Sequence, residues 1–176
     1  MIECQDVSFS YPASTLPDSE RQTGSALKHI SCTIEDGSFV LLCGTSGCGK
    51  TTMTRLFNGL IPHYHEGTYT GSVYLDGKDT RDLSLFDISL KVGSVFQNPR
   101  SQFFNVDTTS ELAFGPENHG MPEDIVRDRV KRVAAQLKLE PLLDRSIFSL
   151  SGGEKQKIAC GSAAAIDPDV YVLDEP

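Results

Sequence analysis

A glycine-rich run at positions 44–52 reads Gly44-Thr45-Ser46-Gly47-Cys48-Gly49-Lys50-Thr51-Thr52. The residues before it, Phe39-Val40-Leu41-Leu42-Cys43, are continuously apolar, which predicts a buried parallel strand. Residues 51–60 predict a helix that ends near Gly59 and Pro62. A strand, a loop of this composition and a helix in direct succession indicate an α/β fold with a phosphate-binding loop.

This loop has a clear chemical logic. Its three glycines, Gly44, Gly47 and Gly49, allow the backbone to turn with its N–H groups inward, and the helix that follows presents its positive end to the same point. The general pattern assigns Lys50 to the β- and γ-phosphates and the Thr51 hydroxyl to Mg²⁺. We therefore predict a nucleotide polyphosphate as ligand.

A second acidic element closes the sequence, Val170-Tyr171-Val172-Leu173-Asp174-Glu175-Pro176. Its apolar run predicts a buried strand, and ligands of parallel sheets bind at the C-terminal tips of strands. We assign Asp174 to Mg²⁺ coordination, largely through water, and Glu175 to polarising the attacking water. The alternative is a solvated turn ahead of a proline.

A third element reads Leu150-Ser151-Gly152-Gly153-Glu154-Lys155-Gln156. Two glycines after a hydroxyl expose backbone N–H groups at the start of a helix, which predicts a second anion site. One nucleotide does not need two such sites. The alternative is an ordinary serine-capped helix.

Together, the phosphate loop, the Leu-Ser-Gly-Gly run and the acidic strand resemble, in this order, the ATP-binding subunit of an ATP-binding-cassette (ABC) transporter over residues 7–176. The resemblance implies a P-loop NTPase fold with a RecA-like parallel core, an antiparallel β layer and an α-helical insertion. The core and β layer would comprise residues 1–98 and 161–176, and the helical subdomain with the signature run residues 99–160. It also implies a single domain that hydrolyses ATP with Mg²⁺, and we expect a truncation after Pro176 that removes a switch histidine.

The same resemblance gives roles to further residues. Residues 151–154 would cap the γ-phosphate of ATP held by a second ABC subunit or domain, identical or paralogous, in a head-to-tail dimer. Gln97, after a strand predicted at residues 91–96, matches the loop that reaches Mg²⁺ and the attacking water. Tyr11 matches the aromatic residue that stacks on adenine, with a core tyrosine as the alternative.

The candidate residues fall into three groups. The catalytic candidates are Lys50, Gln97 and Glu175. The nucleotide-binding candidates are Tyr11, Gly44, Thr45, Ser46, Gly47, Cys48, Gly49, Lys50, Thr51, Thr52, Ser151, Gly152, Gly153 and Glu154. The metal candidates are Thr51, Gln97 and Asp174.

Two further stretches, residues 96–104 and 111–118, resemble the energy-coupling-factor importers of vitamins and transition-metal ions. Arg100 departs from the acidic residue usual in that family. The resemblance implies a transmembrane coupling subunit and a substrate-binding membrane subunit as partners, and a peripheral position on the cytoplasmic face of the cell membrane. Phe103, Phe104 and Phe114 either line the surface that receives coupling helices or pack inside the insertion.

Composition sets outer bounds. A length of 176 residues suits one domain, and a net charge of −8 argues against nucleic acid as a partner. The five cysteines form an odd set without a Cys-x-x-Cys pair, which favours a reducing compartment over a disulfide framework or zinc site. No apolar run is long enough to span a bilayer.

Periodicity predicts the remaining elements. Alternation predicts strands over residues 2–11 and 27–34, and residues 71–75 supply a further strand. Residues 123–139, which follow Pro122, carry apolar side chains at helical spacing.

Two other functions stay open at this point. A soluble ABC ATPase outside transport would share the three motifs, and a catalytically incompetent nucleotide-binding fragment would lack only turnover. The transported substrate is not encoded here, because a separate membrane subunit selects it in the importers that this sequence resembles.

Overall fold

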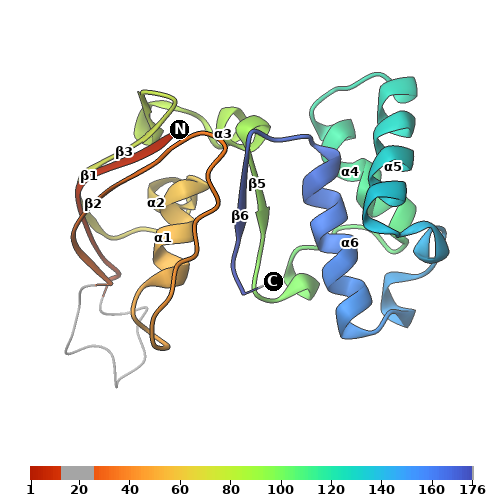
Figure 1. The fold of residues 1–176 in the computed structure, drawn as a ribbon, viewed down its shortest axis with the longest axis horizontal. Helices are drawn as coiled ribbons and strands as arrows, with labels where there is room; N and C mark the ends of the chain where they lie inside the picture. The colour runs from red at the N-terminus through yellow and green to blue at the C-terminus, as the bar shows by residue number, and fades with distance from the viewer. Residues whose placement is uncertain (13–25, 176) are drawn as a thin grey trace. The chain divides into compact units, whose positions relative to one another are not determined.

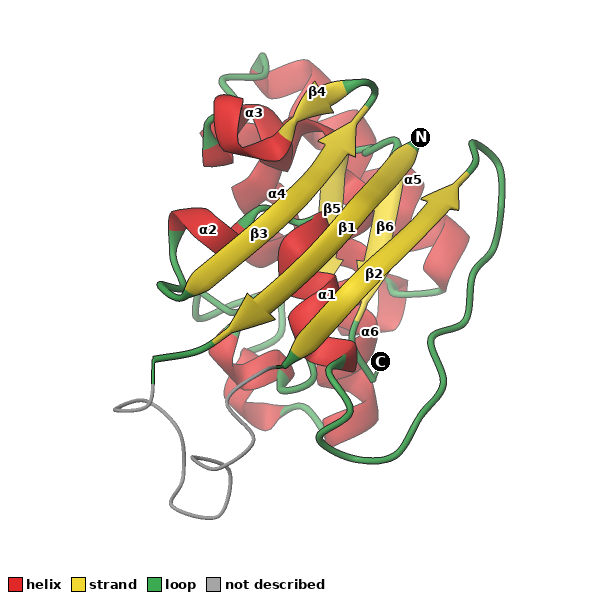
Figure 2. Cartoon of the chain, turned by 90° about the vertical axis from the view of Figure 1, so that its left-hand side faces the viewer, coloured by secondary structure: helices red, strands yellow, loops and turns green. Residues whose placement is uncertain are grey.

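The computed structural model describes residues 1–12 and 26–175 and divides into two compact units, Met1–Ser89 and Leu90–Pro176 (Figure 1). The first unit contains an antiparallel sheet in the order β2-β1-β3-β4 (Figure 2). Its strands are β1 (Ile2–Ser10), β2 (Leu27–Ile34), β3 (Thr68–Leu75) and β4 (Lys78–Asp79). The strands predicted at residues 2–11, 27–34 and 71–75 are thus confirmed. Alternate residues of β1, including Val7 and Phe9, fill one buried face of the sheet.

A bulge interrupts the pairing of β1 with β2 between Cys4 and Val7. Asp6 and His29 both take positive φ there, at 50° and 49°. The hydroxyl of Ser31 accepts the N–H of Asp6, and that of Ser8 accepts the N–H of His29, each at 2.9 Å. These side chains replace ladder bonds that the bulge removes, so the sheet keeps its backbone donors paired.

The helices of the first unit begin with α1 (Lys50–Phe57) and α2 (Leu60–His63), and α3 (Leu85–Lys91) crosses the boundary between the units. The predicted helix at residues 51–60 is present but ends early, at Phe57, because Gly59 adopts a φ of 74°. A Cβ at Gly59 would lie 2.4 Å from Cδ1 of Ile88, so glycine also allows a close approach there.

The buried strand predicted at residues 39–43 is wrong for this structure. No regular secondary structure forms there, and the exposed fraction of Phe39 is 92% and that of Leu41 is 74%. A strand requires hydrogen-bonding neighbours, and none of the strands described in the first unit pairs with this run. Apolar composition alone therefore does not supply the partner that a strand needs.

The second unit holds a parallel pair of strands, β5 (Val92–Val95) and β6 (Val170–Leu173), with Val92 opposite Val170 and Val95 opposite Leu173. The strands predicted at both places are confirmed, although only one face of β6 is buried. Val172 is 7% exposed, whereas Tyr171 and Leu173 are 50% and 46% exposed.

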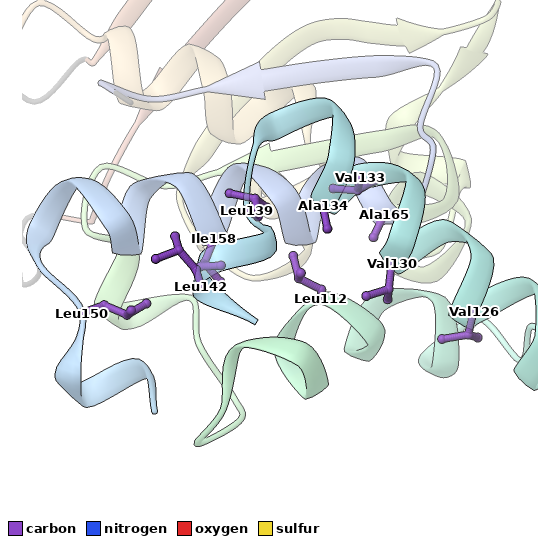
Figure 3. Packing of buried hydrophobic residues seen from close by; sticks show 10 residues of the cluster. All are labelled: Leu112, Val126, Val130, Val133, Ala134, Leu139, Leu142, Leu150, Ile158 and Ala165. Carbon is purple, nitrogen blue, oxygen red and sulfur yellow. The ribbon is translucent and has the colours of Figure 1, made fainter. Parts of the chain in front are cut away.

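Three helices accompany these strands: α4 (Thr108–Asn118), α5 (Glu123–Leu137) and α6 (Gly152–Ala165). Their apolar faces meet in one cluster that includes Leu112 from α4, Val130 and Val133 from α5, and Ile158 from α6 (Figure 3). Valines at positions 126, 130 and 133 give α5 the helical spacing on which its prediction rested. The helix is confirmed and begins directly after Pro122, as expected.

Helix α4 was not predicted. It contains Pro116, which weakens the helical signal, but its first turn is capped by Asp107, whose carboxylate accepts the N–H of Ser110 at 2.8 Å. Short 3₁₀ turns complete the described fold, at Thr80–Asp82, Pro99–Ser101, Glu140–Leu142 and Ile147–Ser149.

Candidate nucleotide-binding site

The phosphate loop at residues 44–52 lies in the first unit, and its exposed backbone runs into the start of α1. Gly47 and Gly49 take φ values of 77° and 101°, which side chains other than glycine rarely adopt. A Cβ at Gly49 would lie 2.5 Å from the carbonyl oxygen of Ala26, and one at Gly44 would lie 2.5 Å from Sγ of Cys48. Glycine is thus required at 49 by both conformation and space.

The start of α1 presents backbone N–H groups that no side chain caps. No side chain caps it and its first turn has no acidic residue, so its first N–H groups and its dipole face the loop without competition from a carboxylate. The ammonium of Lys50 donates to the carbonyl oxygens of Gly44 and Thr45, both at 3.1 Å. The loop therefore folds around the lysine that carries its positive charge.

The acidic strand end lies in the second unit, where β5 and β6 end at the same edge. The N–H of Asp174 donates to the carbonyl of Val95 at 2.9 Å and extends the parallel register beyond Leu173. Asp174 is 7% exposed. Glu175 takes a φ of 49°, and its Oε2 accepts a hydrogen bond from Nε2 of Gln97 at 2.7 Å.

This contact joins two residues that are 78 positions apart in the chain. Sequence patterns placed Gln97 and Glu175 each after a strand, and the parallel pairing of those strands brings the two side chains together. An amide that donates to one carboxylate oxygen fixes the carboxylate and leaves its other oxygen, Oε1, to accept from a water molecule.

The Leu-Ser-Gly-Gly run forms the start of α6, where Ser151 and Glu154 make a capping box. The Ser151 hydroxyl accepts the N–H of Glu154 at 3.3 Å, and the Glu154 carboxylate accepts the N–H of Ser151 at 2.8 Å. The backbone N–H of Ser151 and then its hydroxyl, which both donate to the Glu154 carboxylate at 2.8 Å, lower the pKa of Glu154. A Cβ at Gly152 or Gly153 would meet nothing within 4 Å, so the first turn of the helix opens onto free space.

Tyr11 follows β1 in the first unit and is half-buried. Its ring meets Phe9 edge to face at 4.8 Å between centroids, and its hydroxyl accepts a hydrogen bond from Nη1 of Arg55 at 2.8 Å. Tyr11 is therefore attached to α1, the helix that begins at the phosphate loop.

The structure thus distributes the candidate residues over both units. Tyr11 and residues 44–52 belong to the first, and Gln97, residues 151–154, Asp174 and Glu175 belong to the second. Within the second unit it brings Gln97 to Glu175, and within the first it brings Tyr11 to Thr52, whose Oγ1 lies 3.5 Å from the tyrosine hydroxyl.

Gln102 and Glu111 make supporting contacts in the second unit that sequence reasoning did not predict. Gln102 accepts the N–H of Phe96 and donates to the carbonyl of Ser94, each at 3.1 Å, so it supports the strand end that precedes Gln97. The carboxylate of Glu111, 1% exposed, accepts the N–H groups of Phe104 and Asn105 at 3.0 and 2.8 Å. The sequence offered no signal for Glu111, because neither helix α4 nor the burial of this side chain was predicted; a buried charge of this kind needs donors.

Phe103, Phe104 and Phe114 of the second unit differ in their surroundings. Phe103 packs against the buried clusters, which agrees with a core position. Phe104 is 75% exposed and its ring stacks on that of Phe114 at 4.8 Å between centroids. Phe104 is thus an exposed aromatic residue of the second unit, as is Phe148, which is 78% exposed.

Grouped metal ligands and helices that could cross a membrane are both absent among residues 1–12 and 26–175. Within these residues, no three His, Cys, Asp or Glu side chains are grouped as metal ligands. None of the helices in this part of the chain has both the length and the apolarity that crossing a membrane requires.

A glycine-rich loop wrapped around a lysine at the start of a helix, and a parallel strand pair that ends in carboxylates, define a P-loop nucleotide-binding protein of the α/β class. Residues 27–176 match the family described as ABC transporter. The chain belongs to this family, and the expected fold class and family are confirmed.

Relatives and solved structures agree with this placement. A putative ABC transporter ATP-binding protein of Treponema denticola is 49% identical over 176 residues, which are 100% of this chain and 34% of that protein. A protein of the same description from Pyrococcus horikoshii is 44% identical over 179 residues, covering 100% of this chain and 59% of the relative. The chain spans about a third of the length of the first curated relatives that it matches.

Among solved structures, cbiO1 from Clostridium perfringens, part of the ABC transporter complex cbiONQ, superposes with a TM-score of 0.80 at 28% identity. The match covers 99% of this chain and 65% of that one. A dimeric post-hydrolysis state of the ATP-binding cassette MJ0796, bound to ADP and Pi, gives a TM-score of 0.79 at 24% identity over 98% of this chain and 73% of that one. This second likeness concerns the fold.

Proposed function

We propose that this chain is the ATP-binding and ATP-hydrolysing part of an ABC importer of the energy-coupling-factor type. Membership of the ABC transporter family supports nucleotide binding, and the likeness to cbiO1, which is part of a transporter complex, supports the importer type. The observation that carries the hydrolytic role is the 2.7 Å hydrogen bond between Gln97 and Glu175 at the edge where the parallel strands end.

Each residue has a role in this proposal. The backbone of residues 44–52 and the ammonium of Lys50 hold the phosphates, and the start of α1 stabilises their negative charge. Glu175 polarises the attacking water through Oε1, while Gln97 holds the carboxylate through Oε2. Residues 151–154 meet the γ-phosphate of a second copy or a paralogous domain, with the N–H groups of Gly152 and Gly153 as donors.

Mg²⁺ is the metal expected with ATP. The predicted donors, the Thr51 hydroxyl, the Gln97 amide and the Asp174 carboxylate, are all oxygen ligands of the kind that Mg²⁺ prefers, and the low exposure of Asp174 suits a carboxylate that meets a cation. When bound, Mg²⁺ neutralises charge on the phosphates. The chain's own residues then orient the water and hold the leaving phosphate.

The remaining assignments extend this proposal to the membrane. As the energy-coupling part of an importer, the chain would lie at the cytoplasmic face of the membrane against a transmembrane coupling subunit, with a separate membrane subunit that binds the substrate. Exposed Phe104, stacked on Phe114, is the surface that we assign to the coupling subunit. A vitamin or a transition-metal ion is the expected cargo.

Two variants of the intact protein test the proposal. Glu175→Gln should bind ATP but hydrolyse it very slowly, so that size-exclusion chromatography with ATP shows a trapped dimer. Lys50→Ala should lose nucleotide binding and remain a monomer under the same conditions. ATP binding by Lys50→Ala equal to that of the parent protein would contradict the role assigned to the phosphate loop. A Glu175→Gln variant that stays monomeric with ATP bound would contradict the proposed dimer.

A further inference from the structure

The hydroxyl of Tyr11 is held by two side chains of one helix. Arg55 donates to it from Nη1 at 2.8 Å, and Oγ1 of Thr52 lies 3.5 Å from it. Both residues are on α1, three positions apart, and hence on the same helix face. A hydrogen bond from an ionised donor is stronger than one between neutral groups, which makes Arg55 the main support.

Two further aromatic rings meet the Tyr11 ring at nearly perpendicular angles. Phe9 meets it at 4.8 Å with planes 89° apart, and His65 meets it at 6.2 Å with planes 87° apart. Burial and then the charge of Arg55 lower the pKa of His65, which favours the neutral form of this histidine. Arg55, with its Cζ 5.9 Å from the ring centroid, is therefore the charged member of this group.

Helix α1 also begins within the phosphate loop, because its first residue is Lys50. One helix thus carries the Lys50 ammonium at its start and, about one turn further on, Arg55, which donates to the Tyr11 hydroxyl. The separation between a phosphate held at the loop and a base stacked on Tyr11 is consequently set through α1.

We propose that Arg55 is a positioning residue for the nucleotide base, which fixes the Tyr11 ring as a stacking platform at a set distance from the phosphate loop. The inference rests on the proposed function, since it takes Tyr11 as the base-stacking residue. A ring held in advance loses less conformational freedom when the base binds, so Arg55 strengthens binding of the nucleoside without contacting it. Arginine suits this role because its planar fork donates in a fixed direction.

The test compares two ligands that share their phosphates and differ in the nucleoside. Calorimetric titrations of the intact protein would use Mg-ADP and Mg-pyrophosphate, neither of which is hydrolysed by an ATPase site. The variants are Arg55→Met, Arg55→Lys, Tyr11→Phe and Tyr11→Ala. Arg127→Met is the matched control, because Arg127 is an exposed arginine of α5 that pairs with Glu123.

We expect Arg55→Met to weaken ADP binding by about three- to tenfold, the range of one ordinary hydrogen bond, because Arg55 acts on the ring and not on the ligand, and to leave pyrophosphate binding unchanged. Tyr11→Phe should have a similar effect, and combining the two substitutions should add little, because both remove the same contact. Arg55→Lys should recover most of the loss, since an ammonium also donates to the hydroxyl. Arg127→Met should bind both ligands normally.

The outcomes separate the two levels of the argument. Unchanged ADP binding in Tyr11→Ala would overturn the base-stacking role of Tyr11, and this inference with it. Weak ADP binding in Tyr11→Ala together with normal binding in Arg55→Met would overturn the positioning role alone. Equal losses for ADP and pyrophosphate in Arg55→Met would show that Arg55 supports the phosphate loop instead, which also overturns the inference.

Discussion

Replacing Gly49 with alanine should destabilise the protein more than the same change at Gly47, although both glycines lie in the phosphate loop. Gly47 has a φ of 77° with nothing within 4 Å of its ideal Cβ, so Gly47→Ala meets only the conformational cost of about 1–2 kcal/mol. Gly49 has a φ of 101°, and its Cβ would lie 2.5 Å from the carbonyl oxygen of Ala26.

A backbone oxygen cannot rotate away as a flexible side chain can, so either α1 or the start of β2 must shift. Overpacking of this kind costs about 1–3 kcal/mol beyond the conformational term. We expect Gly49→Ala to lower the free energy of unfolding by about 2–5 kcal/mol. Gly152→Ala is a control without positive φ or steric contact, and it should change stability little.

Urea denaturation of the intact protein gives the free energy of unfolding of all three variants, and these values can be compared when the m-value is unchanged. Because the shift would move the first N–H groups of α1, Gly49→Ala should also weaken Mg-ADP binding. Equal losses of stability in Gly49→Ala and Gly47→Ala would refute the contact with Ala26 as the reason that glycine stands at position 49.

Three further outcomes follow from buried or capping groups. Burial and the neighbouring Cys32 raise the pKa of Cys4 to about 12. At pH 8, maleimide should therefore label exposed Cys32 far faster than Cys4, as followed by mass spectrometry. Equal labelling rates would contradict the burial of Cys4. Ser151→Ala should cost about 1 kcal/mol in urea denaturation through loss of the cap of α6, and an unchanged midpoint would argue against the capping box. Glu111→Ala should lower the free energy of unfolding by about 2–4 kcal/mol, because the N–H groups of residues 104–105 lose their acceptor. Hydrogen exchange at these two N–H groups should also become faster, and unchanged exchange rates would contradict this role.

Local signals predicted much of the fold. Alternation located β1 and β2, the spacing of valines located α5, and the Ser-x-x-Glu pattern at residues 151–154 is itself the sequence signature of the capping box that begins α6. Each of these elements depends on residues close together in the chain, so the sequence carries the information directly.

Other features depend on pairing between distant segments. The run at residues 39–43 has the composition of a buried strand but no described strand pairs with it, and α4 forms despite Pro116 because it packs against α5 and α6. Cys4 faces Cys32 only through the register of β1 with β2. Periodicity does not encode such partners.

The candidate site divides in the same way. The phosphate loop and the acidic strand end were visible as motifs, since their chemistry needs fixed neighbours in sequence. The hydrogen bond of Gln97 to Glu175 required the parallel pairing of β5 with β6. The hydrogen bond of Arg55 to Tyr11 required α1 to lie beside the end of β1. Motifs therefore identified the chemical groups, and the fold supplied their contacts.

The most direct test of the proposed function is steady-state hydrolysis of Mg-ATP by the intact protein and by its Glu175→Gln variant, with ATP binding measured in parallel. A general base contributes about 10²–10⁴-fold to rate, so we expect turnover to fall by at least about 100-fold in the variant while ATP affinity stays within a few-fold. Turnover of Glu175→Gln close to that of the parent protein would contradict the account.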